Sequence, residues 1–308
     1  MKTLSSTPCF SLNIQSEPVR TFSTVSTARA EPLKRFSASR RTLSQLKQAA
    51  NERRPARSLE IREILWSGRR VRAITFDVGG TLIKPWPSVG HIYSEVAARH
   101  GFPGLSVATL NRQFIAAWGA AKEFDYSRLA WAQLVDETFR GLTDKPPSQT
   151  FFAKLHSWFA QPEAWRVFED VVPTLETLTS RGIKLGLISN WDERLRPLLR
   201  RLNLHDYFEA IVVSCEVSFA KPSAVIFELA AEKLAVPPEA VLHVGDSPTN
   251  DVEGARAAGL EAVQLQRGAR GRKSEVRGQR PEVIADLRPP ISDLRLPISD
   301  LRLLISDF

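Results

Sequence analysis

The sequence predicts an α/β protein in which a mostly parallel sheet carries helices on both faces and a helical segment is inserted. Over residues 71–266, short apolar runs rich in β-branched residues alternate with helical patterns. Residues 85–165 interrupt this alternation with helical patterns alone. Strands that alternate with helices pair in parallel through right-handed crossovers, so we expect a single sheet.

Residues 1–70 are assigned as a basic N-terminal extension. Residues 1–56 are rich in Ser, Thr and Arg and poor in acidic residues, so they bury too little apolar surface to fold alone. They are interpreted as a disordered extension or, alternatively, as an organellar transit peptide. Residues 57–68 are expected to form a short helix that leads into the first strand.

The first expected strand, residues 71–76, ends at a carboxylate. Asp77 follows the apolar run directly, and Gly79, Gly80 and Thr81 come next. Glycines let the backbone turn tightly, and open α/β sheets bind ligands beyond the carboxyl ends of their strands. The stretch also fits an ordinary Asp–Gly turn, so by itself it does not predict a site.

Residues 85–165 are expected to form a helical domain inserted after this strand. Residues 82–87 are interpreted as a stiff turn that leaves the sheet. Apolar residues then recur at helical spacing, and prolines separate the successive patterns. Five of the seven tryptophans lie between Trp86 and Trp165, which indicates core packing within a small helical bundle.

The alternation of strands and helices resumes after residue 165. The further strands expected are residues 183–188, 210–214, 241–245 and 261–265. Helices are expected at residues 172–181, around 195–202, at 223–234, and up to Gly259. The α/β core is therefore assigned to residues 71–84 and 166–266.

Residues 267–308 are assigned as a basic linker followed by a low-complexity tail. The run Ile-Ser-Asp-Leu-Arg-Leu starts at Ile291 and its pattern returns every seven residues. The apolar spacing mimics a coiled coil, but Pro297 lies inside the short repeat. No function is expected of this tail.

The charge of the chain is distributed unevenly. Residues 1–72 hold 15 Lys and Arg against five acidic residues, whereas residues 73–266 hold 18 against 23. The core is therefore mildly acidic although the whole chain carries a net charge of +8. Because no nucleic-acid motif accompanies the basic ends, nucleic-acid binding is not expected.

Cysteine usage and hydropathy indicate the compartment. Cys9 and Cys215 lie far apart without metal-site spacing, which favours a reducing environment. No apolar run approaches the ~20 residues that span a bilayer. We expect a cytoplasmic protein without a membrane segment, or an organellar one if residues 1–56 are a transit peptide. The sequence indicates no oligomeric state.

Polar residues with complementary chemistry gather at one edge of the expected sheet. A carboxylate can attack phosphorus and hold the phosphoryl group as an acyl phosphate. Two converging carboxylates require a hard cation such as Mg²⁺, while hydroxyl, amide and ammonium groups can bind phosphoryl oxygens. The residues concerned are Asp77 and Thr81, Ser189 and Asn190, Lys221, and Asp246 and Asp251.

In this order the motifs resemble those of the haloacid dehalogenase-like hydrolase superfamily. The matching segments are Asp77-Val78-Gly79-Gly80-Thr81-Leu82, Ser189-Asn190, Lys221-Pro222, and Gly245-Asp246-Ser247-Pro248-Thr249-Asn250-Asp251. The resemblance covers residues 71–266 and implies a Rossmann-like core. The helical insertion is similar to the cap of the subfamily whose cap lies between the first and second motifs. The resemblance implies a Mg²⁺-dependent hydrolase, specifically a phosphatase of small phosphorylated metabolites.

The resemblance also implies residue roles. Asp77 is the nucleophile, and Asp77, the Gly79 carbonyl, Asp246 and Asp251 hold Mg²⁺, with Asp251 as a ligand or a partner of one. Of the remaining motif residues, those assigned to catalysis or to phosphoryl binding are Thr81, Ser189, Asn190 and Lys221.

One position departs from the family pattern. Phosphatases of the family place a second Asp, which acts as general acid and base, where this chain has Gly79. Such proton transfer contributes ~10²–10⁴-fold in rate. Glu95, His91 or Asp125 of the insertion are candidate substitutes. A catalytically weakened scaffold that binds a phospholigand therefore stays open as an alternative. Hydrolysis of carbon–halogen or carbon–phosphorus bonds would use the same nucleophile, but the metal-binding fourth motif argues against a dehalogenase.

Overall fold

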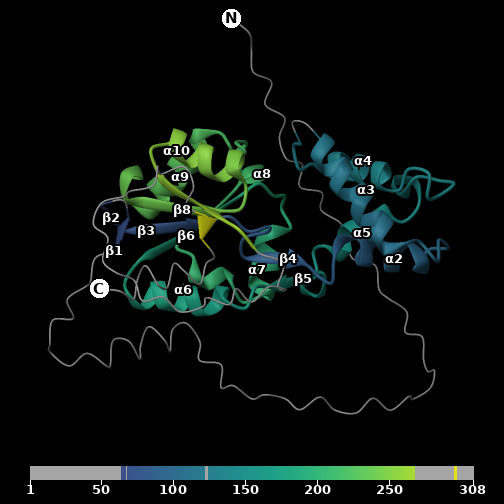
Figure 1. Ribbon diagram of the computed structural model, residues 1–308, viewed down its shortest axis with the longest axis horizontal. Coiled ribbons are helices and arrows are strands. Elements are labelled where there is room, and N and C mark those ends of the chain that lie inside the picture. Colours follow the sequence, from purple (N-terminus) through teal and green to yellow (C-terminus); the bar gives the residue numbers. More distant parts are fainter. Residues whose placement is uncertain (1–63, 67, 122–123, 268–294, 297–308) are drawn as a thin grey trace, which may run out of the picture. The chain divides into compact units, whose positions relative to one another are not determined.

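The computed structural model describes residues 64–66, 68–121, 124–267 and 295–296 of the 308-residue chain. Its centre is a parallel sheet in the order β10-β9-β8-β3-β6-β7 (Figure 1). The strands are β3 (Ala73–Phe76), β6 (Lys184–Ser189), β7 (Ala210–Val213), β8 (Val241–Gly245), β9 (Glu261–Leu265) and β10 (Arg295–Leu296). The five strands expected from the sequence are present, and the predicted α/β fold class is confirmed.

Helices cover both faces of this sheet (Figure 1). Helices α6 (Val171–Ser180) and α7 (Leu195–Arg201) pack on one face, and α9 (Ala224–Leu234) and α10 (Gly254–Ala257) pack on the other. The short helix α8 (Ser214–Val217) follows β7 directly. Successive side chains of a strand point to opposite faces of the sheet. Because these strands are apolar on both sides, as buried parallel strands are, helices pack against both faces.

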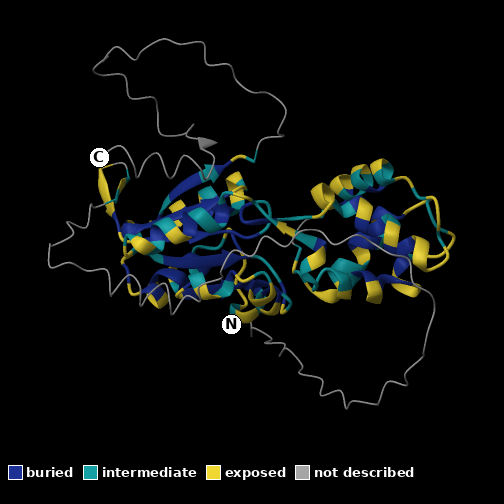
Figure 2. Ribbon diagram, turned by 90° about the horizontal axis from the view of Figure 1, so that it is seen from below, coloured by how far each residue is buried: buried dark blue, intermediate teal, exposed yellow. Residues whose placement is uncertain are grey.

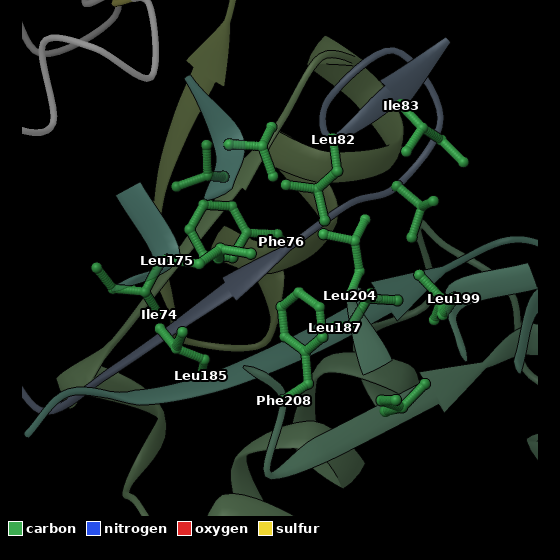
Figure 3. Packing of buried hydrophobic residues seen from close by; sticks show 14 of the residues in the cluster. Ile74, Phe76, Leu82, Ile83, Leu175, Leu185, Leu187, Leu199, Leu204 and Phe208 are labelled. Carbon is green, nitrogen blue, oxygen red and sulfur yellow. The ribbon is translucent and has the colours of Figure 1, made fainter. Parts of the chain in front are cut away.

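The alternation is visible along β3. Ile74 and Phe76 pack with Leu175 of α6 and Leu187 of β6 (Figure 3), while Ala73 belongs to the cluster under α9 and α10. Each of these apolar side chains is buried, and full burial stabilises a side chain of Leu, Ile or Phe size by about 1.5–3 kcal/mol.

The position of β3 fixes where a site can form. It lies between β6 and β8, with β7 beyond one neighbour and β9 beyond the other. The connection that leaves β3 runs to β6, whereas the connection that leaves the adjacent strand β8 runs in the opposite direction to β9. Open parallel sheets bind ligands outside the carboxyl end at such a reversal. That end is where Asp77 follows the strand.

The described part of the helical insertion contains four α-helices with a hydrophobic cluster of their own. They are α2 (Val89–Arg99), α3 (Val107–Ala120), α4 (Arg128–Thr138) and α5 (Phe152–Trp158). Ser88, Ser106 and Ser127 begin the first three, because each serine oxygen accepts a hydrogen bond from a backbone N–H of the first turn. Exposed residues lie on the outward sides of these helices (Figure 2). The boundaries of the inserted helical domain at residues 85 and 165 stay a proposal.

The interpretation of residues 82–87 as a turn is wrong. Strand β4 (Ile83–Pro85) pairs antiparallel with β5 (Trp165–Val167), so a two-stranded ribbon joins the start and the end of the insertion. Pro85 is tolerated because it pairs at the last position of this two-stranded ribbon. The chain therefore enters and leaves the helices through adjacent strands.

The expected helix at residues 57–68 is also corrected. Strand β1 (Ile64–Trp66) pairs antiparallel with β2 (Arg69–Val71), and Gly68 between them has a φ of 76°. A positive φ at glycine favours a tight hairpin over a helix. Residues 57–63, like the segment 1–56 considered as a transit peptide, lie outside the described residues.

Two further details differ from the prediction near the C-terminus. Asp246 is followed by a π-helical turn (Pro248–Glu253) before α10, instead of one regular helix. Residues 295–296 pair with β9 as the edge strand β10, although no strand was expected in the tail. The rest of residues 268–308 lies outside the described part. None of the described helices has the length and apolar character needed to cross a membrane.

Candidate active site

Asp77 lies at the centre of a charged cluster at the carboxyl end of β3. Lys221 Nζ donates to Asp77 Oδ1 at 2.6 Å and to Asp251 Oδ1 at 2.5 Å. Ser189, the last residue of β6, donates its hydroxyl to Asp77 Oδ1 at 3.4 Å. All four side chains are buried. The sheet thus brings together residues that are up to 174 positions apart in the sequence.

Three carboxylates converge at this point. Asp77, Asp246 and Asp251 each offer an oxygen, and these oxygens all lie within 4.8 Å of one another. The backbone N–H of Ser247 donates to Asp251 Oδ2 at 2.9 Å and fixes the last of them. The expected convergence of Asp77 and Asp246 is observed. An all-oxygen set of this kind fits a hard divalent cation such as Mg²⁺.

Two glycines make room for the carboxylates. A Cβ atom on Gly80, whose φ is 79°, would lie 2.3 Å from Asp246 Oδ2. A Cβ atom on Gly245 would lie 2.2 Å from the carboxyl carbon of Asp251. Any side chain at either position would therefore displace one of the acidic groups. By contrast, a Cβ on Gly79 would meet only Trp191, at an ordinary 3.4 Å.

Asn190 holds the backbone of Lys221. Its side-chain amide donates to the Lys221 carbonyl at 2.9 Å, and its oxygen accepts from the Lys221 N–H at 2.7 Å. This paired bond links the loop after β6 to the loop before α9. The role of Asn190 in phosphoryl binding stays a prediction; in the structure its amide holds the backbone of Lys221, whose ammonium group contacts Asp77.

The charges in the cluster perturb one another. Burial raises the pKa of Asp77 to about 6, since the Asp251 and Asp246 carboxylates add to the effect and Lys221 only partly offsets it. Burial would also raise the pKa of Asp251, but Lys221 and His243 outweigh burial and hold it below its ordinary value. Burial opposes the charge on Lys221, yet the two carboxylates keep the pKa of Lys221 raised. Lys221 is thus cationic and shared by two acids.

His243 was not singled out by the sequence interpretation. It lies inside β8, fully buried, with Nε2 at 3.2 Å from Asp251 Oδ1 and Nδ1 hydrogen-bonded to Thr75 Oγ1 at 2.9 Å. The Phe227 ring meets its imidazole edge to face at 5.1 Å. A histidine within an otherwise apolar buried strand is the signal that could have found it, because a buried polar group needs partners.

A cavity of about 440 Å³ opens above this cluster. The floor of the cavity is formed by Gly79 and Gly80 together with the polar cluster Asp77, Ser189, Lys221, Asp246 and Asp251. Its other side comes largely from the insertion and is mostly aromatic. Four of these residues, Phe114, Trp118, Tyr126 and Trp131, are called the aromatic wall below.

Interactions across the cavity involve residues of both the α/β core and the insertion. Arg194 Nη1 donates to the His156 carbonyl of α5 at 2.7 Å, while its other nitrogens bind the Asp192 carboxylate at 2.8 and 2.5 Å. Tyr126 of the insertion and Asn190 of the core both line the cavity; burial raises the pKa of Tyr126, and the Asn190 side chain partly offsets the rise. The cavity is therefore bounded by both parts of the chain.

Several predicted residues lie away from the reacting end. Thr81 is fully buried, does not line the cavity, and its hydroxyl has no hydrogen-bond partner among the described residues. His91 bonds to Ser88 on the exposed side of α2, and Glu95 pairs there with Arg99.

Asp125 is exposed and accepts a hydrogen bond from the N–H of Ser127 at the start of α4. None of the three candidate acids of the insertion is among the residues that line the cavity.

Comparisons with known proteins identify the family of this chain. A model of the haloacid dehalogenase-like hydrolases matches residues 71–259. Haloacid dehalogenase-like hydrolase domain-containing protein 3 of Danio rerio is 35% identical over 209 residues, which make up 64% of this chain and 86% of that protein. A phosphoglycolate phosphatase of Shigella boydii is 28% identical over 214 residues, covering 64% of this chain and 82% of the phosphatase.

The fold points to the same group of proteins. The crystal structure of a HAD phosphatase from Thermococcus onnurineus superposes with a TM-score of 0.51 at 25% identity, over 77% of this chain and 98% of that one. The matched residues 71–259 contain all four motifs and the inserted helices. The chain belongs to the haloacid dehalogenase-like hydrolases.

Proposed function

We propose that this hydrolase is a Mg²⁺-dependent phosphatase of small phosphorylated metabolites that works through a phosphoryl group on Asp77. One observation carries the proposal. Three carboxylate oxygens lie within 4.8 Å of one another, and a buried ammonium group contacts two of the carboxylates. Such a cluster suits a phosphate ester, which needs a nucleophile and positive charge at one place. The phosphoglycolate phosphatase named above supports this class of reaction.

Asp77, Asp246 and Asp251 would hold the metal ion, with the backbone carbonyl of Gly79 as a further ligand. The donor set fits Mg²⁺ because all of these groups are hard oxygen ligands, and the room left by Gly80 lets Asp246 approach. When bound, Mg²⁺ supplies positive charge to phosphoryl oxygens and reduces the repulsion between the carboxylates and an anionic substrate.

The chain's own residues divide the remaining work. The Asp77 carboxylate attacks phosphorus, and the bond from phosphorus to the ester oxygen breaks. Lys221 and the Ser189 hydroxyl stabilise the phosphoryl oxygens, since both already contact Asp77. The Asn190 side chain keeps Lys221 in place by binding the Lys221 backbone. Thr81 belongs to the same motif as Asp77 and acts as a buried structural residue.

Gly79 restricts the substrates that can react. It provides no proton for the leaving group, and His91, Glu95 and Asp125 do not line the cavity. Esters with good leaving groups should therefore react much faster than alkyl phosphates, because general acid catalysis contributes ~10²–10⁴-fold where it is needed.

The proposal is tested by phosphate release from an aryl phosphate with and without Mg²⁺, using the parent protein and the Asp77→Asn variant. We expect release that requires Mg²⁺ and falls to background in the variant. Asp170→Asn is the matched control, because Asp170 is a partly buried carboxylate paired with Arg267 outside the cavity. Equal release by the parent and Asp77→Asn would show the mechanism to be wrong.

A second function is favoured by Gly79 itself. A protein without a general acid could bind a phospholigand and turn over no ester. This reading predicts calorimetric binding of Mg²⁺ and inorganic phosphate, with no Mg²⁺-dependent release from any aryl or alkyl phosphate. Turnover of an aryl phosphate that depends on Asp77 excludes it.

A further inference from the structure

The aromatic wall presents a large aromatic surface and no charged groups. Trp118 lies nearly parallel to Trp131, at 5.7 Å and 18° between rings, and to Phe114, at 6.2 Å and 18°. Tyr126 meets Trp118 and Trp131 edge to face, at 6.4 Å from each. Among the described residues of the insertion, none that lines the cavity carries a carboxylate, an ammonium or a guanidinium group.

The wall is left partly uncovered. Trp118 is 40% exposed although it lies beside the cavity. An exposed cluster of large rings beside a concave site is typical of a surface that binds an apolar group. Tyr126 also has a φ of 62°, in the left-handed region that a tyrosine rarely adopts. Strained residues of this kind cluster at binding sites, and Tyr126 lines the cavity.

The cations that line the cavity are already neutralised. The Arg194 guanidinium forms a two-point ion pair with Asp192 and also donates to the His156 carbonyl. Lys221 is shared by Asp77 and Asp251. Burial and the neighbouring Arg194 lower the pKa of His156 to about 4, which keeps its imidazole neutral at physiological pH. A substrate with a second anionic group would therefore find no free counter-charge on the described lining residues.

The missing acid at Gly79 points the same way. Without a proton donor, the leaving oxygen departs as an anion. A phenol, with a pKa near 10 as in tyrosine, forms such an anion far more readily than an aliphatic alcohol. An aromatic leaving group therefore satisfies both the chemistry of the floor and the composition of the wall.

We propose that the substrate is an aryl phosphate monoester whose ring carries no charge, with the ring bound against Phe114, Trp118, Tyr126 and Trp131 and the phosphoryl group at Asp77. This rests on the proposed phosphatase function and names its substrate class. The Asp77 oxygen bonds to phosphorus, and the phosphorus–oxygen bond to the ring breaks with its electron pair, giving a phenolate that takes a proton from solvent. Water then cleaves the acyl phosphate and returns inorganic phosphate and the Asp77 carboxylate.

Binding and leaving-group chemistry are separated with phosphonates, which do not hydrolyse. In the presence of Mg²⁺, calorimetry compares phenylphosphonate with methylphosphonate. We expect phenylphosphonate to bind about tenfold more tightly, as expected for stacking and burial of one ring. Trp118→Leu should reduce this ratio about three- to tenfold, and Trp118→Phe should retain most of it. Trp158→Leu is the matched control, because Trp158 is a half-buried ring of the same insertion that does not line the cavity.

The charge requirement is tested by turnover of phenyl phosphate and 4-carboxyphenyl phosphate, which differ by one carboxylate remote from the reacting bond. We expect kcat/KM to be at least about tenfold higher for phenyl phosphate. Equal binding of the two phosphonates, or preference for the carboxylated ester, overturns the substrate class even when hydrolysis depends on Mg²⁺ and Asp77. Ring-selective binding without hydrolysis of any ester supports the aromatic site and overturns the phosphatase function instead.

Discussion

The floor and the wall of the cavity are built on opposite principles. On the floor, Asp77, Lys221 and Asp251 form a buried network in which each charge has a partner. On the wall, Trp118 and its neighbours present rings without charge. The floor therefore determines which bond is broken, and the wall determines which leaving group is accepted. Substitutions that remove a charged group from the floor should affect all esters alike, whereas substitutions on the wall should affect discrimination between them.

The largest expected effect comes from removing the cation of the floor. Lys221→Met leaves the buried Asp77 and Asp251 carboxylates without their common partner. We expect kcat to fall about 10²–10³-fold for every ester and the free energy of unfolding to fall by about 3–5 kcal/mol. Steady-state kinetics and urea unfolding measure the two effects. A loss confined to aromatic esters would contradict the division between floor and wall.

Restoring the missing acid should sharpen the comparison. Gly79→Asp fits sterically, because its Cβ would lie 3.4 Å from Trp191. We expect turnover of an alkyl phosphate to rise at least tenfold, within the ~10²–10⁴-fold range of general acid catalysis, while phenyl phosphate changes much less. Parallel rate measurements on both esters give the answer. No gain on the alkyl phosphate would show that proton transfer to the leaving group is not the missing step.

The next effect concerns the room beside Asp246. Gly80→Ala must accommodate a φ of 79° and a Cβ atom 2.3 Å from Asp246 Oδ2. We expect a loss of about 1–3 kcal/mol in stability and weaker Mg²⁺ binding by calorimetry. Gly79→Ala is the control, since its Cβ makes only an ordinary contact. If both variants bind Mg²⁺ equally well, Asp246 does not need the space that Gly80 leaves.

The smallest expected effect lies on the insertion side. Burial and Arg194 lower the pKa of His156 to about 4, so NMR should show no titration of its ring between pH 5.5 and 8. Because the unfolded chain binds this proton near pH 6.5, His156 makes stability fall as the pH decreases from about 6.5 to 4. His156→Gln should flatten that slope in pH-dependent unfolding. A midpoint near 6.5 in the folded protein would place a cation in the cavity and contradict its uncharged character.

The sequence was informative wherever a strand end carried the signal. Asp77, Ser189 and Asp246 each follow an apolar run, and the parallel sheet places the ends of such runs at one edge. The pairing of β4 with β5 could not be predicted, because Pro85-Trp86-Pro87 is typical of a turn and the partner strand follows the whole insertion.

Contacts between side chains far apart in the sequence could not be predicted either. His243 depends on Thr75, which lies 168 positions earlier in the chain. Asn190 binds the backbone of Lys221. This contact depends on the relative positions of two loops, which no local sequence pattern predicts. Tyr126 could not be distinguished from core aromatics, because its position beside the cavity depends on how the insertion packs.

The most direct test is to look for the phosphoryl group on Asp77. Gly79 supplies no base to activate water, so breakdown of the acyl phosphate should be slow and the adduct should accumulate. After mixing with phenyl phosphate and Mg²⁺ and quenching in acid, mass spectrometry should find one phosphoryl group on the peptide that contains Asp77, and none in Asp77→Asn. Continued turnover with that peptide unmodified, and undiminished in Asp77→Asn, would contradict the account.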